Sequence, residues 1–350
     1  MSDENVLLVH STAHASWRRP SPRIPVSIEL FDWKEGKVQA ELGQSYCWNW
    51  QQGARALWLD KTRVIFNVYD EAADCYRSEI VCSATGQKSE LAIPVQEIGR
   101  EGRVYGLSYE ALALSRPDYG YRNLRAALRS LFDNGIDQYD PGTGHVRRIL
   151  NIASLVDEAA FRHGIQPTRG KLNHIMASPD CGTIVFLFRY ILGDQRVTDL
   201  YSYDLEQNHH RLELADLGLS HACWWDSQTL FSTMNGTEGF GYYFVHVGTD
   251  KLPSLICLSN DEHTSRINEE FLLTDSYPDK FGLRRLMALG IHSRQFVEIA
   301  SSPEPLLFQG ETRCDSHHSL SPSGRWIQFD CAVGHRRSVA VIKNPMLKDT

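Results

Sequence analysis

The chain has 350 residues, of which 42% are hydrophobic and 23% charged, and this composition is typical of a folded globular protein rather than a disordered one. Its net charge of −7 argues against a protein that binds nucleic acid through its phosphates, because such binding needs clustered lysine and arginine. We find neither an apolar run of about 18 residues, which a membrane span needs, nor a secretory signal. Eight cysteines without a CxxC pair fit reduced thiols, so we expect a cytoplasmic protein.

Two kinds of segment alternate along the chain, and both are patterned as β-structure. The first kind is a polar turn followed by β-branched and aromatic residues, and the second is a hairpin with apolar alternation on both sides of a turn. The first kind covers residues 52–70, 95–109, 173–188, 220–234, 262–275 and 316–330. The hairpins cover residues 25–42, 75–93, 136–149, 199–214, 241–257 and 284–300, and short strands at 6–10 and 338–343 complete the series.

Counting these pairs gives seven units in 350 residues, or about 50 residues each, which is the repeat length of a propeller blade. The sequence therefore predicts an all-β fold, a seven-bladed β-propeller that forms one domain over residues 1–350. We expect residues 6–42 to close the ring by sharing a blade with the strands after His317. Apolar residues at helical spacing predict one short helical insertion at residues 149–163.

Four histidines recur at the start of the first kind of segment, 47, 42 and 54 residues apart, close to one blade each. They are His174, His221, His263 and His317. Because the innermost strands of a propeller converge on its central channel, equivalent positions on successive blades form an arc around one end of it. Imidazoles in such an arc bind a metal or move a proton. The alternative for any one of them is a hydrogen bond to the turn of a neighbouring blade.

Asp315 extends this pattern, because residues i and i+2 of a strand point the same way, so that Asp315 and His317 would face one point. With His263 from the preceding blade they form a mixed nitrogen and oxygen site that suits Mn²⁺, Fe²⁺ or Zn²⁺. Gln309 and Glu311 lie upstream and could complete it. The alternative for Asp315 is a carboxylate that caps a turn. His318 has the opposite phase and is expected to be structural or exposed at the rim.

Other candidates concern the substrate. Arg189 leaves a buried strand and Arg196 lies in the following loop, which suits the binding of a substrate carboxylate, although an ion pair between blades is the alternative. Trp48 and Gln52 belong to a segment of aromatic and amide residues with the composition of a sugar-binding surface. Tyr121 ends a second tyrosine-bearing loop. For both segments a plain propeller core is the competing interpretation.

Six strings, in order along the chain, resemble the oligogalacturonate lyase family and its uncharacterised bacterial relatives. They are WNWQQG at 48–53, RPDYGY at 116–121, NHIMASPD at 173–180, SH with WD at 220–226, LTDSYPD at 273–279 and GETRCDSH at 310–317. The resemblance covers residues 45–335. It implies a seven-bladed propeller that degrades pectin-derived uronides in the cytoplasm by β-elimination, with a bound Mn²⁺.

Carried over residue by residue, the resemblance puts metal ligation on His263 and His317, the proton-abstracting base on His221, and an assisting arginine on Arg189 or Arg196. His174 is the next candidate for the base. The sequence departs from the lyase pattern at Asp315, where the lyases have a histidine, and the lyase glutamine ligand has no clear match, with Thr312 and Gln309 nearest.

The sequence leaves three functions open. The first is a metal-assisted lyase acting on a uronic-acid oligosaccharide, because a metal that chelates the carboxylate acidifies the neighbouring C–H and a neutral histidine can take that proton. The second is a non-catalytic propeller that binds a glycan or a protein. The third is a hydrolase or epimerase that uses the same proton chemistry on a uronate. A bound divalent metal would favour the first and third over the second.

Overall fold

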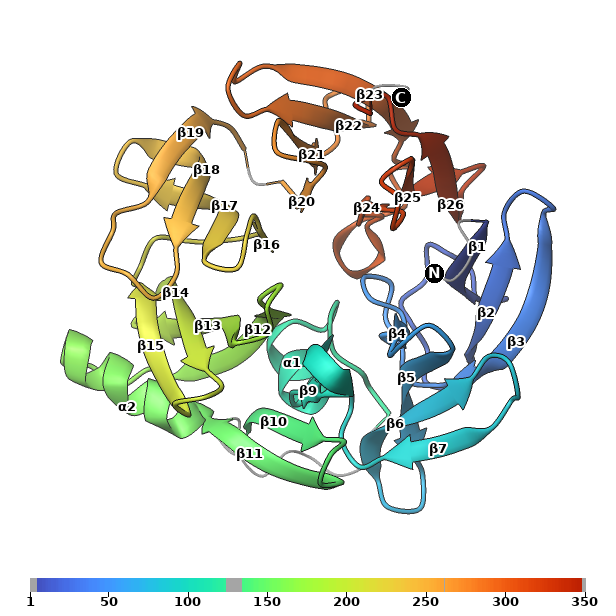
Figure 1. Ribbon diagram of the computed structural model, residues 1–350, viewed down its shortest axis with the longest axis horizontal. Helices are drawn as coiled ribbons and strands as arrows, with labels where there is room; N and C mark the ends of the chain where they lie inside the picture. The colour runs from blue at the N-terminus through green and yellow to red at the C-terminus, as the bar shows by residue number, and fades with distance from the viewer. Residues whose placement is uncertain (1–4, 124–133, 261, 348–350) are drawn as a thin grey trace. The chain divides into compact units, whose positions relative to one another are not determined.

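The structure is a computed structural model that describes residues 5–123, 134–260 and 262–347. Within these residues it contains seven antiparallel sheets, each made from strands that follow one another in the chain, together with two α-helices (Figure 1). The fold is a seven-bladed β-propeller, as the repeat predicts. No helix in the described ranges is long and apolar enough to cross a membrane.

The chain divides into two compact units. Unit 1 comprises residues 1–177 and 186–197, and unit 2 comprises residues 178–185 and 198–350. One sheet, β12-β13-β14-β15, has strands that belong to both. The expected single domain stays a prediction.

Unit 1 contains the first three sheets. The strands of the first are β1 (Val6–Ser11), β2 (Val26–Asp32) and β3 (Lys37–Ser45). The second has β4 (Leu57–Trp58), β5 (Arg63–Asp70), β6 (Cys75–Cys82) and β7 (Lys88–Leu91). The third has β8 (Glu97–Ile98), β9 (Val104–Gly106), β10 (Gly135–Asp140) and β11 (His145–Asn151), with a 3₁₀ turn, η1 (Arg100–Gly102), between β8 and β9.

The fourth sheet has β12 (Arg169–Ala177), β13 (Thr183–Leu192), β14 (Gln195–Asp204) and β15 (His209–Leu214). The fifth has β16 (Ala222–Trp224), β17 (Thr229–Gly236), β18 (Gly239–His246) and β19 (Ser254–Leu258). The sixth has β20 (Thr264–Arg266), β21 (Phe271–Asp275), β22 (Leu283–Gly290) and β23 (Phe296–Pro303). The seventh has β24 (Ser319–Leu320), β25 (Trp326–Val333) and β26 (Arg336–Lys343), preceded by the 3₁₀ turn η2 (Gly310–Thr312).

The N-terminal strands differ from the prediction. β1, β2 and β3 pair with one another in a sheet of their own, and β24, β25 and β26 form another. The expectation that residues 6–42 complete the last blade is therefore wrong. The physical reason is that residues 6–45 already hold three strands, and the middle one, β2, buries alternate side chains from Val26 to Asp32, so these strands form a blade without borrowed ones.

The helical prediction is confirmed by α2 (Ile152–His163). Asn151 caps its start by accepting a hydrogen bond from the backbone N–H of Ala153, and Gly164 ends it in the left-handed conformation. A second helix, α1 (Tyr109–Ser115), was not predicted, because seven residues carry little periodic signal. Ser108 caps α1, which packs against β12 (Figure 1).

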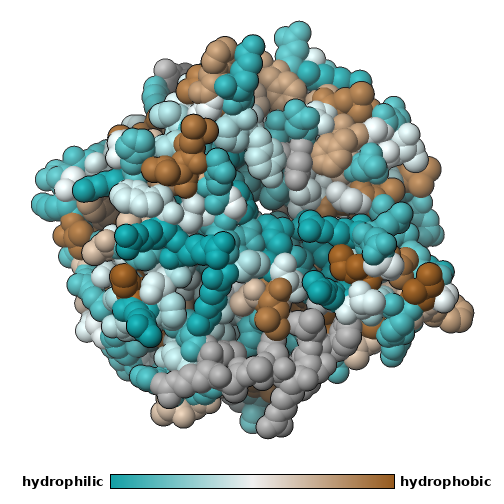
Figure 2. Space-filling model, turned by 180° about the vertical axis from the view of Figure 1, so that it is seen from behind, coloured by the Kyte–Doolittle hydropathy of each residue, from teal (hydrophilic) through white to brown (hydrophobic). Residues whose placement is uncertain are grey.

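Apolar contacts between successive blades hold each unit together. In unit 2, Leu273 and Leu286 of the sixth sheet pack with Ile327 and Phe329 of the seventh. This contact fixes the segments that lead into β20 and β24. On the face seen in Figure 2, apolar side chains lie in small groups among hydrophilic ones.

Candidate functional site

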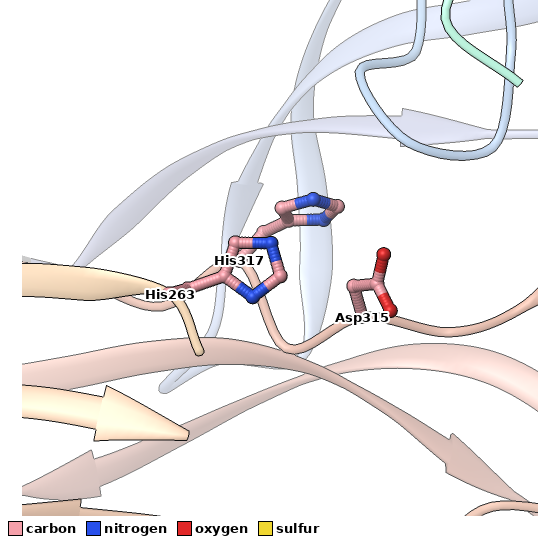
Figure 3. A group of neighbouring side chains, drawn as sticks. All are labelled: His263, Asp315 and His317. Carbon is pink, nitrogen blue, oxygen red and sulfur yellow. The ribbon is translucent and has the colours of Figure 1, made fainter. Parts of the chain in front are cut away.

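Three of the predicted ligands come together in unit 2. His263, Asp315 and His317 each offer one ligand atom, and these atoms lie within 4.8 Å of one another. Figure 3 shows the two imidazole rings and the carboxylate gathered from the segments that lead into β20 and β24. Asp315 is buried and the two histidines are partly buried. This group, called the His-Asp-His group below, is the kind of donor set that holds Mn²⁺, Fe²⁺ or Zn²⁺.

The reason for the convergence differs from the one predicted. Residues 313–318 are not a strand, so the alternation argument that paired Asp315 with His317 does not apply to them. Instead, His317 has a left-handed backbone, with φ of 36°, which redirects its side chain. The backbone N–H of Asp330 donates to the carbonyl of Ser316 and holds this loop against β25.

Two successive residues at the end of β21 position His263. Asp275 accepts hydrogen bonds from the His263 backbone N–H at 2.9 Å and from its ring Nδ1 at 3.1 Å. Thr274 and Tyr242 donate their hydroxyls to Glu262, the residue before His263. With Nδ1 engaged, His263 has Nε2 to offer a metal, which is how a second-shell carboxylate orients a metal-binding histidine.

His263 and Asp275 shift each other's pKa in opposite directions. Burial alone would lower the pKa of the His263 imidazole, but the charge and hydrogen bond of Asp275 outweigh it and raise that pKa. Burial would raise the pKa of Asp275, but the charge and hydrogen bond of His263 keep it well below its usual range. Asp275 therefore stays a carboxylate and makes the His263 ring more electron-donating. Sequence reasoning missed Asp275. The feature that could have revealed it is an acidic residue at the end of the apolar strand 271–275.

Asp315 is held by two arginines. Its Oδ1 is 3.3 Å from the guanidinium of Arg284, and its Oδ2 accepts from Arg313 Nε at 2.7 Å. Arg284 is almost fully buried and also pairs with Glu304 at 2.7 Å and with Asp275 at 3.7 Å. Sequence reasoning missed Arg284, which links three carboxylates. Asp315 is therefore part of an ion-pair network and not a turn cap.

The residues present fit a divalent metal. The Nδ1 atom of His317 is buried, has no hydrogen-bond partner within the described chain, and lies 3.7 Å from Asp330 Oδ2. A carboxylate has about four lone-pair sites, so Asp315 can accept from two arginines and still bind an ion. Around this group the four carboxylates of Asp275, Glu304, Asp315 and Asp330 still outnumber three guanidiniums, those of Arg284, Arg313 and Arg337.

The expected additional ligands have other roles. Gln309 caps η2, where its side chain bonds the Thr312 backbone and the Thr312 hydroxyl bonds the Gln309 backbone in return. Glu311 lies within η2 and is not a member of the His-Asp-His group. His318 is structural, as expected: it is buried, its Nδ1 lies 3.1 Å from the Ser265 hydroxyl, and burial lowers its pKa to about 4.

His221 lies beside the group without belonging to it. Its ring centroid is 4.2 Å from that of His263, and the rings of His263 and His317 are 5.0 Å apart. The backbone of His221 is fixed by β17, because the Thr233 N–H and the Ser232 hydroxyl donate to its carbonyl. An imidazole at this distance can take a proton from a molecule held by the group.

The remaining candidates lie in unit 1. His174, in β12, has a left-handed backbone with φ of 53° and lines a small cavity with Gln52. Arg189 lies in β13, and Arg196 lies at the start of β14 rather than in a loop as predicted. Both are close enough to Lys171 for their charges to act on it. Their role in binding a carboxylate stays a prediction. Sequence reasoning missed Lys171.

Trp48 and Tyr121 are core residues. Trp48 is 4% exposed, packs edge-on against Trp50 and donates its indole N–H to the Ile24 carbonyl. Tyr121 is 2% exposed, stacks on Tyr109 with ring centroids 4.2 Å apart, and its hydroxyl accepts from the Asn67 amide. Burial contradicts a substrate-binding role for both, and packing explains them instead.

No family model matches the chain, and no curated protein has a similar sequence. Among solved structures, the acylaminoacyl peptidase of Pyrococcus horikoshii is 9% identical with a TM-score of 0.53, over 81% of this chain and 43% of that one. The propeller domain of the Trilobed protease from Pyrococcus furiosus is 10% identical with a TM-score of 0.52, over 91% and 84% of the two chains. An oligogalacturonate lyase in complex with manganese is 11% identical with a TM-score of 0.48, over 97% of each chain.

This chain thus spans less than half of the peptidase chain. The lyase is no more similar than the peptidase or the protease domain. At these identities the likenesses show a shared fold, the β-propeller, and nothing about activity.

Proposed function

We propose that the protein is a metal-assisted lyase that cleaves a uronic-acid oligosaccharide by β-elimination, with Mn²⁺ as the expected ion. The observation that carries the proposal is the His-Asp-His group, whose ligand atoms lie within 4.8 Å of one another. The resemblance of its sequence to the oligogalacturonate lyases supplies the substrate class. Cytoplasmic pectin breakdown is the corresponding expectation.

His263, Asp315 and His317 would hold the ion. When bound, a divalent cation withdraws charge from a substrate carboxylate and makes the neighbouring C5–H more acidic. His221, whose ring lies 4.2 Å from that of His263, would take the C5 proton. The electrons of that C–H bond form the C4–C5 double bond, the C4–O bond breaks, and the departing sugar oxygen takes up a proton. Asp275 keeps His263 in the tautomer that offers Nε2.

One observation favours a second candidate, a non-catalytic propeller that binds a glycan or a protein. Both carboxylate oxygens of Asp315 already contact arginines, at 3.3 and 2.7 Å. An ion-pair network of this kind stabilises a loop without any metal, and a fold does not fix a function. Metal binding separates the two candidates, because the second needs none.

The test combines metal analysis with an absorbance assay. The purified protein is treated with a chelator, reloaded with Mn²⁺, and incubated with saturated oligogalacturonides or with an unsaturated digalacturonide. Elimination from saturated chains creates a double bond conjugated to a carboxylate, so ultraviolet absorbance rises; an enzyme that consumes the unsaturated disaccharide lowers it. We expect one of these changes with metal and none without. Failure to take up Mn²⁺ would favour the binding protein.

Metal uptake with unchanged absorbance would also contradict the lyase. In that case, exchange of the C5 proton with solvent deuterium would identify epimerase chemistry at the same group. The exposed His292, in the turn between β22 and β23, provides a matched control: His292→Ala should behave like the unmodified protein in every assay.

A further inference from the structure

Exposed apolar side chains gather beside the His-Asp-His group in unit 2. They come from two segments, the loop of residues 276–282 between β21 and β22 and residues 304–309 after β23. Their exposed fractions are large: Tyr277 48%, Phe281 74%, Leu306 86% and Leu307 58%. Exposed apolar residues that are scattered singly need no explanation, but a cluster of them marks a binding surface. These four side chains are called the apolar patch below.

Strand pairing places the apolar patch at the edge of the sixth sheet that carries His263. Neighbouring strands of this sheet are antiparallel, so β20 begins, β21 ends, β22 begins and β23 ends at one edge. His263 directly precedes β20 at that edge. The backbone N–H of Glu304 donates to the carbonyl of Gly282 at 2.7 Å, and this bond joins the two segments of the patch. The patch and a candidate metal ligand therefore share one edge.

One buried arginine connects the apolar patch to the His-Asp-His group. The guanidinium carbon of Arg284 lies 5.7 Å from the centre of the Tyr277 ring. The same guanidinium lies 3.3 Å from Asp315 Oδ1. Only the guanidinium of Arg284 therefore separates Tyr277 from a candidate metal ligand, so a chain molecule held at the group has the patch beside it.

The apolar patch also carries a positive charge. The exposed Lys280 places its Nζ 5.0 Å from the centre of the Phe281 ring. The neighbouring carboxylate of Asp279 pairs with Arg285 at 2.8 Å, so its charge is already balanced. An aromatic face beside a cation matches a sugar acid, whose ring has an apolar C–H face and whose carboxylate is negative. A protein partner matches it less well, because a stable protein–protein interface takes about 20–30 residues a side.

We propose that the apolar patch binds the neighbouring sugar of a uronic-acid chain whose first uronate lies at the His-Asp-His group. The ring of that neighbouring sugar packs on Phe281 and Tyr277, and its carboxylate lies at Lys280. The proposal rests on the proposed function and deepens it, because it makes the preferred ligand a chain of uronates rather than a single one. The patch adds binding energy only for the longer ligand.

The experiment compares the binding of galacturonate and of saturated trigalacturonate by calorimetry. The protein is the full chain, loaded with Mn²⁺ and carrying His221→Ala, so that elimination is too slow to consume the ligand. We expect trigalacturonate to bind more tightly than galacturonate. Adding Phe281→Ala should weaken trigalacturonate binding about two- to tenfold, the size of an aromatic contact, and leave galacturonate binding unchanged. Phe281→Tyr keeps the ring and should restore trigalacturonate binding.

Two further variants test the charge and the location. Lys280→Met should weaken trigalacturonate binding about two- to fivefold, as expected for an exposed ion pair. Lys251→Met, at an exposed lysine in the loop between β18 and β19, is its matched control. Phe161→Ala, at a 93% exposed phenylalanine of α2, is the control for Phe281→Ala. Both controls should bind trigalacturonate like the parent protein.

The outcomes separate this proposal from the lyase. Trigalacturonate that binds no more tightly than galacturonate, or equally well after Phe281→Ala, would overturn the role of the apolar patch even if the unmodified protein performs elimination. Trigalacturonate binding that depends on Phe281 in a protein without elimination would support the patch and contradict the lyase. Failure of both ligands to bind would overturn both. A dimer in sedimentation that Phe281→Ala abolishes would assign the patch to a second copy of the chain and overturn the proposal.

Discussion

The His-Asp-His group of unit 2 and the basic residues around Lys171 in unit 1 both bury charged side chains, but they differ in the charges that lie beside them. In unit 2 each charge has a partner within the chain: His263 has Asp275, and Asp315 has Arg284 and Arg313. In unit 1 the charges of Arg116, Arg189 and Arg196 act on Lys171, together with that of Asp118, which pairs with Arg116. The first arrangement pairs opposite charges around a possible ion site, whereas in the second burial and the neighbouring arginines lower the pKa of Lys171 to about 7.

The largest expected effect follows from removing a ligand of the His-Asp-His group. His317→Ala deletes a buried nitrogen that makes no hydrogen bond in the described chain, so we expect the protein to lose both bound Mn²⁺ and all measurable elimination. Metal analysis and the absorbance assay, with His292→Ala as control, measure these losses. Mn²⁺ retained at full occupancy would show that the ion binds elsewhere.

His221→Ala should separate chemistry from metal binding. A general base contributes about 10²–10⁴ in rate, so turnover should fall by that factor while Mn²⁺ stays bound. If His221→Ala removes the metal, His221 is a ligand and the division of roles is wrong. Turnover at the unmodified rate would place the base elsewhere.

Asp275→Asn tests whether the paired charges of unit 2 matter for metal binding. Loss of a carboxylate that orients a metal-binding histidine typically costs about 10- to 100-fold in metal affinity, and we expect a weakening of that size. The measurement is a Mn²⁺ titration against a competing chelator. Asp279→Asn is the control, because Asp279 lies four residues after Asp275 and pairs with Arg285 instead of His263. Unchanged affinity in Asp275→Asn would mean that the Asp275–His263 bond only holds the loop.

Much of the fold and part of the site could be predicted from the sequence, for a physical reason. A blade repeats the same strand pattern, so His221, His263 and His317 mark equivalent positions without any knowledge of the structure. Asp275 and Arg284 were not predicted, because their contacts with His263 and Asp315 depend on strand register and on the path of a loop, neither of which sequence spacing encodes. Trp48 and Tyr121 lie in segments whose composition fits both a sugar-binding surface and a buried core. Only the burial of the two side chains distinguishes these possibilities.

The smallest expected effect concerns the stability of unit 1 without ligand. The folded protein holds Lys171 with a pKa of about 7, below the value of about 10.4 in an unfolded chain. The unfolded state therefore binds more protons between these values, and the cost of Lys171 to stability is full below pH 7 and disappears as pH rises towards 10. Lys171→Met should thus raise the free energy of unfolding at pH 7 by about 1 kcal/mol, within the range of about 0.5–2 kcal/mol that a single stabilising substitution typically gives. Urea unfolding at pH 7 and at pH 9.5 measures the difference, which should shrink at the higher pH. A variant less stable than the unmodified protein at pH 7 would mean that Lys171 is paired in the folded chain, and the contrast between the two units would fail.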